Sequence, residues 1–141
     1  MPVRQRFLIV VLLAFVSLGW SAPAAADAEA DIRAVIIDQV DAISAGDGAR
    51  AFGHASPGVQ DRFGSSEMFM FMVEQGYHPL IRPRAFEVEE VLRDGDRAAA
   101  RARVVARDGR LYQAFYPLRR QADGRWRIEG CQLKEAPGKA L

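Results

Sequence analysis

Cysteine is almost absent from this chain of 141 residues, since Cys131 is the only one. No disulfide can therefore form within the chain in any redox compartment, and the fold must be held together by its core. A lone cysteine in an apolar segment is usually a small buried side chain. We expect Cys131 to be a buried strand residue.

Histidine is also scarce, and neither charge sign is in excess. His54 and His78 stand in no two-ligand spacing, so we predict no metal site. With 19 basic and 18 acidic residues, the chain has no field that would attract nucleic acid. It also lacks a glycine-rich phosphate loop and a dinucleotide fingerprint. We therefore predict no cofactor and no nucleic-acid partner, and we assign no catalytic residue.

What the chain does have is one long apolar run, at its N-terminus. Two arginines precede the run from Phe7 to Trp20, and a stretch of small residues ending at Ala26 comes after it. This order is that of a secretory signal, and the run is too short to span a bilayer. We predict a signal peptide over 1–26 that is removed on export. The protein would then be periplasmic in a Gram-negative source and free of the membrane.

The remaining residues, 27–141, have the usual length of one domain. Apolar residues recur at helical spacing from Asp31 to Ile43, and further short helices are predicted over 48–54, 59–63 and from the serine pair before Glu67 to Gly76. The last of these contains six consecutive apolar residues, 68–73. Such a helix is either buried between layers or presents a second apolar face to a partner.

The pattern changes from helical to alternating after Ala85, and three Asp-Gly pairs divide the C-terminal part of the chain. Such pairs between alternating segments are the strongest short-range hairpin signal. Four antiparallel strands are predicted, over 85–93, 97–107, 111–121 and 125–134. The segment 77–84 is expected to be extended because of its prolines, and the tail after Glu135 is expected to be loose.

The side chains that share a sheet face depend on the hairpin loops. A two-residue turn at Asp108-Gly109 would place together three arginines and two tyrosines, namely Arg101, Arg103, Arg107, Tyr112 and Tyr116. A two-residue turn at the last Asp-Gly pair would leave this face solvated. A three-residue loop there would instead bring Trp126 and Ile128 onto it and enclose the arginines. A single-residue slip reverses every side chain, so both alternatives stay open.

The succession of these motifs carries a resemblance. Ala55-Ser56-Pro57, Gly76-Tyr77, and Trp126-Arg127-Ile128 with Gly130-Cys131 are among the residues that support it. The chain resembles the nuclear-transport-factor-2-like fold, with a cystatin-like look, and more narrowly an exported bacterial family, domain of unknown function 4864. The resemblance implies an α+β fold in which N-terminal helices pack on a curved four-stranded antiparallel meander to form a cone. It implies no activity.

Three classes of function are compatible with these observations. The first is noncatalytic binding of a small molecule or peptide in an apolar pocket lined by Phe69, Met72, Val73, Tyr77, Tyr116 and Trp126. Enclosed arginines, Arg101 and Arg103, would bind an anion there. The second is a protein interaction module, such as a homodimer. The third is a hydrolase or isomerase of the same fold, which would require Asp38 and His54 to meet in one cavity, with Tyr77 near its mouth.

Overall fold

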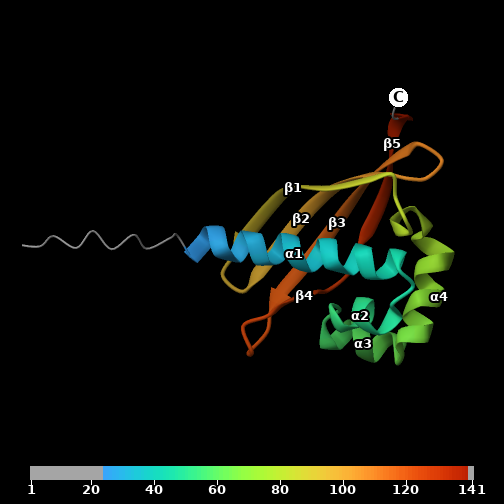
Figure 1. Ribbon diagram of the computed structural model, residues 1–141. Helices are drawn as coiled ribbons and strands as arrows, with labels where there is room; N and C mark the ends of the chain where they lie inside the picture. The colour runs from blue at the N-terminus through green and yellow to red at the C-terminus, as the bar shows by residue number, and fades with distance from the viewer. Residues whose placement is uncertain (1–23, 140–141) are drawn as a thin grey trace, which may run out of the picture.

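The computed structural model describes residues 24–139, so residues 1–23 of the expected signal peptide lie outside the described residues and the signal stays a prediction. Four helices and a short 3₁₀ turn precede five strands (Figure 1). The helices are α1 (Ala24–Ser44), α2 (Gly48–Gly53), α3 (Pro57–Phe63) and α4 (Ser66–Gly76), and the turn is η1 (His78–Leu80). Within the described part, no helix is both long and apolar enough to cross a membrane.

The helix boundaries are explained by capping chemistry. The side chains of Asp47, Ser56 and Ser65 each accept a hydrogen bond from a backbone N–H in the first turn of α2, α3 and α4. Helix α1 is longer than expected because it begins at Ala24, within an alanine-rich stretch of high helix propensity. The segment 77–84 is not extended throughout, since Pro79 occupies the first turn of η1, where a missing N–H costs nothing.

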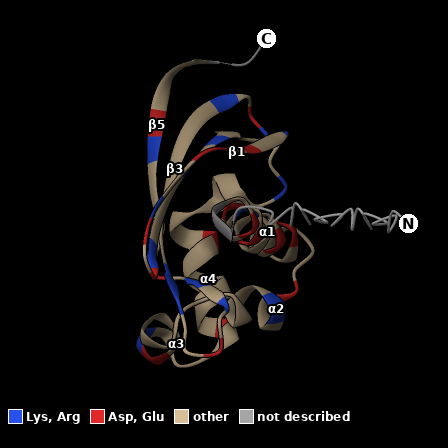
Figure 2. Cartoon of the chain, turned by 90° about the vertical axis from the view of Figure 1, so that its left-hand side faces the viewer, with Lys and Arg blue, Asp and Glu red and all other residues tan. Residues whose placement is uncertain are grey.

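The strands form one antiparallel sheet, and α1 runs across its concave face. Seen along α1, the sheet curves around the helix (Figure 2). The strands are β1 (Ala85–Asp94), β2 (Arg97–Val105), β3 (Arg110–Arg120), β4 (Trp126–Ile128) and β5 (Gln132–Lys139). Helices α2, α3 and α4 gather at one end of the sheet (Figure 1). The expected α+β meander, with helices packed on a curved sheet, is confirmed.

The predicted fourth strand is divided in two. β4 pairs with the end of β3, with Leu118 opposite Ile128, and β5 pairs with its beginning, with Phe115 opposite Gln132. The pairing shifts between these points, near Pro117, which has no N–H to continue the ladder. β5 also extends to Lys139, so the expectation of a loose tail after Glu135 was wrong.

The two-residue turn considered for Asp108-Gly109 does not form, and the pairing of β2 with β3 differs by one residue from the pairing that such a turn would give. Arg101 lies opposite Phe115 and Arg103 opposite Gln113, because the loop holds three residues, 107–109, rather than two. The carboxylate of Asp108 accepts the backbone N–H of Arg110 at 3.0 Å, and Gly109 takes a φ of 84° that favours glycine. Together these features stabilise the three-residue loop with a glycine in the left-handed region.

The last hairpin has the same construction, with loop residues 122–124 and Gly124 at a φ of 83°. Trp126 and Ile128 therefore join Tyr116 and Leu118 on the covered face, as the three-residue alternative requires. The arginines do not share that face, because the first hairpin contains the same kind of loop. The core under α1 joins Ile32 and Ile36 with inward side chains of the sheet, chiefly Ala98, Ala100, Ala102, Val104, Ala114, Tyr116, Leu118, Trp126 and Ile128.

Strand β1 contains a bulge at Glu89, which has no partner on β2, while Val88 faces Ala102 and Glu90 faces Arg101. The irregularity brings two consecutive carboxylates to one guanidinium. Arg101 Nη1 lies 2.6 Å from Glu89 Oε2, and Arg101 Nε lies 3.4 Å from Glu90 Oε2. Arg101 is therefore an ion-paired residue of the outer sheet face.

Candidate functional site

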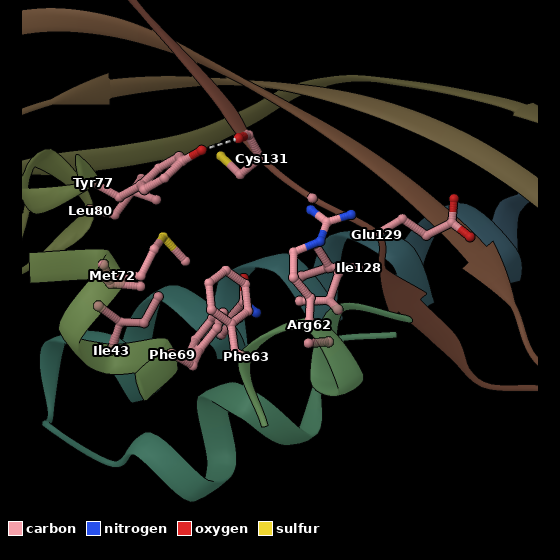
Figure 3. A pocket seen from close by; sticks show the side chains of 15 residues that line it. Ile43, Arg62, Phe63, Phe69, Met72, Tyr77, Leu80, Ile128, Glu129 and Cys131 are labelled. Atoms are coloured by element: carbon pink, nitrogen blue, oxygen red, sulfur yellow. Dashed lines mark hydrogen bonds between the residues drawn. The ribbon is translucent and has the colours of Figure 1, made fainter. Parts of the chain in front are cut away.

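A second apolar cluster lies beyond the end of α1, between the short helices, and it encloses a partly open cavity of about 160 Å³. Phe63 and Phe69 line the cavity, and their ring centroids lie 5.9 Å apart. Phe52 packs against Phe69 within the cluster, with ring centroids 5.6 Å apart. The cavity is walled by α3, α4, the end of α1 and the connection between β4 and β5 (Figure 3).

Four of the six residues expected to line a pocket meet here: Phe69, Met72, Val73 and Tyr77. Tyr116 and Trp126 do not line this cavity, because both are buried under α1 in the neighbouring cluster. These two side chains are on the inward face of the sheet, and α1 covers that face, so they cannot reach the cavity. Figure 3 shows Met72, Phe69 and Ile43 directed into the same space.

The polar groups at the inner end of the cavity come from Tyr77 and Cys131. The Tyr77 hydroxyl donates to the backbone carbonyl of Cys131 at 2.7 Å. Burial raises the pKa of the Cys131 thiol to about 12 and also raises the pKa of Tyr77. Beside this thiol, the fully buried Tyr116 hydroxyl has no hydrogen-bond partner of good geometry within residues 24–139.

The mouth of the cavity carries an arginine that the sequence analysis did not select. Arg62 forms no ion pair with any described residue, and its guanidinium reaches toward the β4–β5 connection (Figure 3). The neighbouring carboxylate of Glu129 points away from the cavity and is bound by Arg119, with Nε at 2.8 Å from Oε1. The mouth is therefore positive. The position of Arg62 could have been inferred from the sequence. Arg62 follows the inward Val59 by three residues, and residues three apart lie on the same face of a helix.

Asp38 and His54 do come together, but outside this cavity. His54 Nε2 lies 2.5 Å from Asp38 Oδ2, and Arg50 Nε lies 3.0 Å from the same oxygen. The bonds from Arg50, and then those from His54, lower the pKa of Asp38 to about 2. The pair borders a shallow depression beside Ile37, and Tyr77 is not among its lining residues. The condition for an acid/base pair inside the cavity is therefore not met.

Arg101 and Arg103 lie on the outer face of the sheet and form no enclosed anion site with the tyrosines.

Elsewhere on the surface, helix α4 buries Phe69 and Val73 but exposes Met68 by 52% and Phe71 by 57%. Both alternatives for the apolar run 68–73 therefore apply: one side of α4 is buried, and the other side presents an exposed apolar face. Within the described residues, no three His, Cys, Asp or Glu side chains are grouped so as to hold a metal ion.

Solved structures of similar shape identify the fold. An NTF-2-like protein of unknown function from Silicibacter pomeroyi superimposes with a TM-score of 0.58 at 19% identity, over 79% of this chain and 98% of that one. An NTF2-like protein of unknown function from Shewanella baltica superimposes with a TM-score of 0.57 at 12% identity, over 82% of this chain and 98% of that one. A SEC-C motif containing protein from Rhodopseudomonas palustris gives 0.54 at 17% identity, over 70% and 75%. At these identities the likeness shows the fold, which is NTF2-like.

Sequence comparison then gives the family. Residues 25–141 match the family described as Domain of unknown function (DUF4864), and the chain belongs to it. None of the curated proteins compared with the chain matches it.

Proposed function

We propose that the cavity between α3, α4 and the β4–β5 connection binds a small apolar molecule that carries one acidic group. The observation that carries this proposal is the pairing of an apolar cavity with the guanidinium of Arg62 at its mouth, which forms no ion pair within residues 24–139. Buried apolar surface would supply the affinity, and a charge-assisted bond to Arg62 would orient the ligand.

The volume sets the size of the ligand. An apolar cavity of about 150 Å³ is known to hold one benzene ring. The cavity here, about 160 Å³, suits a single aromatic ring or a short acyl chain, with its carboxylate outside near Arg62. Larger ligands would have to displace the rings of Phe63 or Phe69.

The proposal is for binding without chemistry. Among the residues that line the cavity, the one carboxylate is Glu129, which is bound by Arg119, and the one thiol is Cys131. Because burial raises the pKa of this thiol to about 12, it is protonated at neutral pH and is a poor nucleophile.

The test is a calorimetric titration of the protein with benzoate and with its neutral counterpart, benzyl alcohol. We expect saturable binding of both and tighter binding of benzoate. Arg62→Gln should remove the preference for benzoate, whereas Arg125→Gln, a change at an exposed loop arginine, should keep it. Met72→Trp should fill the cavity and abolish both affinities, while the matched change Met68→Trp on the exposed side of α4 should not. Equal behaviour of the two tryptophan variants would refute the proposal.

A second candidate function is self-association through α4, favoured by the exposure of Met68 and Phe71. Sedimentation of the protein at increasing concentration tests it. A dimer that dissociates in Phe71→Asp, but not in the outer-sheet variant Leu92→Asp, would support it, and a monomer at all concentrations would exclude it.

A further inference from the structure

A second hollow, of about 510 Å³, lies where η1 and the segment after it meet the loop between β2 and β3. We call it the arginine groove, because Arg82 contributes one wall and Arg107 the other. It shares no lining residue with the cavity described above. A ligand in the groove would therefore be independent of the one proposed for the cavity.

Arg82 has an unfavourable backbone conformation. Its φ is 47°, and within residues 24–139 it is the one residue other than glycine with a positive φ. It also precedes Pro83, and a residue before proline normally prefers extended backbone. The Arg82 N–H donates to Ser44 Oγ at 2.9 Å, which helps to hold this conformation. Backbone strain of this kind persists where the surrounding structure imposes it, and it is concentrated at functional positions.

The charges around the groove leave the arginines without carboxylate partners. Within the described part of the chain, neither Arg82 nor Arg107 forms an ion pair. The carboxylate of Asp108, in the groove wall, accepts the N–H of Arg110 and lies 3.6 Å from Arg110 Nε. Glu74 is the remaining carboxylate of the lining.

A third guanidinium lies beside the same loop. A Cβ atom placed on Gly109 would lie only 3.2 Å from Arg84 Nη1, so the absence of a side chain at Gly109 allows this close approach. The groove is thus bordered by an excess of guanidinium groups over free carboxylates. Guanidinium groups pair in a two-bond geometry with carboxylate and phosphate oxygens.

We propose that the arginine groove binds a small oxyanion ligand, one whose carboxylate or phosphate group is held between Arg82 and Arg107. The strained backbone at Arg82 fixes the position of the Arg82 Cα and Cβ atoms at the groove wall. The three-residue loop 107–109 fixes those of Arg107 in the same way. Carboxylate and phosphate ligands have this chemistry in common: each is a compact anion with several oxygen acceptors.

The experiment is a titration of the whole protein, monitored by ¹⁵N chemical shifts, with inorganic phosphate in one arm and citrate in the other at constant ionic strength. We expect saturable shifts at the amides of residues 78–82 and 106–109 in at least one arm. Saturation by phosphate alone would identify a phosphoryl ligand, and saturation by citrate alone a carboxylate ligand. The absence of saturable shifts in both arms would overturn the proposal.

Variants test whether the two arginines are responsible. Arg82→Gln and Arg107→Gln should each weaken binding by about tenfold or more, the loss expected for a charge-assisted hydrogen bond. Arg93→Gln, at an exposed arginine on β1, is the matched control and should bind as the parent does. Arg82→Gly removes both the charge and the backbone strain, so it should lose affinity without melting at a lower temperature. Equal loss in Arg93→Gln, or full affinity in Arg82→Gly, would refute the site.

Discussion

The Tyr77 hydroxyl donates to the backbone carbonyl of Cys131 across 2.7 Å, and this bond joins residues 54 positions apart in the chain. It ties the end of α4 to the connection between β4 and β5, the two walls that close the inner end of the cavity. The short helices and the sheet are held in a fixed relation at this point by one side chain.

Replacing Tyr77 by Phe removes this bond and leaves the ring in place. We expect a loss of about 1 kcal/mol in the free energy of unfolding, the net contribution of one hydrogen bond. Denaturant melts measure it. Tyr112→Phe, at a half-buried tyrosine for which the structure shows no such bond, is the control and should change stability less. Equal losses would show that the Tyr77 bond contributes nothing specific.

Replacing Trp126 by Ala should cost about 3–5 kcal/mol, the range for a large buried aromatic side chain. Trp126 is only 4% exposed and packs in the core under α1. Leu92→Ala, at a side chain that is 62% exposed, should change stability by less than about 0.5 kcal/mol. A loss below about 1 kcal/mol for Trp126→Ala would contradict its place in the core.

Arg101→Gln and Arg103→Gln should have small effects on stability, because both side chains face outward. We expect less than about 0.5 kcal/mol for Arg103→Gln and up to about 1 kcal/mol for Arg101→Gln, which loses its ion pairs with Glu89 and Glu90. Thermal melts with and without benzoate measure both effects. Ligand stabilisation that disappears in these variants would point to an anion site on the outer sheet face.

The ion pairs of Asp38 predict a dependence of stability on acid. Because Arg50 and His54 lower the pKa of this carboxyl from 3.8 to about 2 in the folded state, the ionised form is favoured by folding. Its contribution is present above pH 3.8 and is lost as the pH falls through about 2. The Asp38 side chain is 38% exposed, so solvent limits the effect to about 1 kcal/mol or less.

The measurement is the difference in unfolding free energy between the parent and Asp38→Asn across this range. The variant should be less stable than the parent near neutral pH, and the difference should shrink as the pH falls from 3.8 through about 2 and disappear only below that pH. A difference that does not change with pH would show that the carboxylate charge is not the cause.

The Cys131 thiol should resist alkylation in the folded protein. A pKa of about 12, in place of 9.0, lowers the thiolate fraction at mildly alkaline pH by about 10³, and the rate of reaction with iodoacetamide should fall by a similar factor. Mass spectrometry measures the extent of reaction, and the same protein in denaturant should react at the ordinary rate. Rapid labelling of the folded protein would show that the thiol is accessible and ionised.

The sequence predicted the type of nearly every element because capping residues and periodicity act locally. Ser65 and Gly76 mark the ends of α4 closely, and the Asp-Gly pairs mark the places where the chain turns. The face of each strand was not predictable in the same way. It depends on whether the loop at Asp108 holds two residues or three, and an Asp-Gly pair is a sequence signal that both kinds of loop share.

The candidate site was predicted in part for a similar reason. Phe69, Met72 and Val73 belong to a conspicuous apolar helix, and Tyr77 comes directly after it. Tyr116 and Trp126 were expected to line the same pocket, but their side chains face inward on the sheet and pack in the core under α1. Arg62 was missed because its significance depends on Glu129 being bound by Arg119, a contact between segments that only the folded chain brings together.

The bulge at Glu89 also bears on how the protein behaves when concentrated. β1 is an edge strand, and an edge with a regular row of free N–H and C=O groups can recruit a strand from another molecule and begin aggregation. The extra residue interrupts that row in the middle of β1, and the neighbouring Glu87, Glu89 and Glu90 add like charges that would repel a second copy. The irregularity therefore protects this edge of the sheet against growth into a larger, intermolecular one.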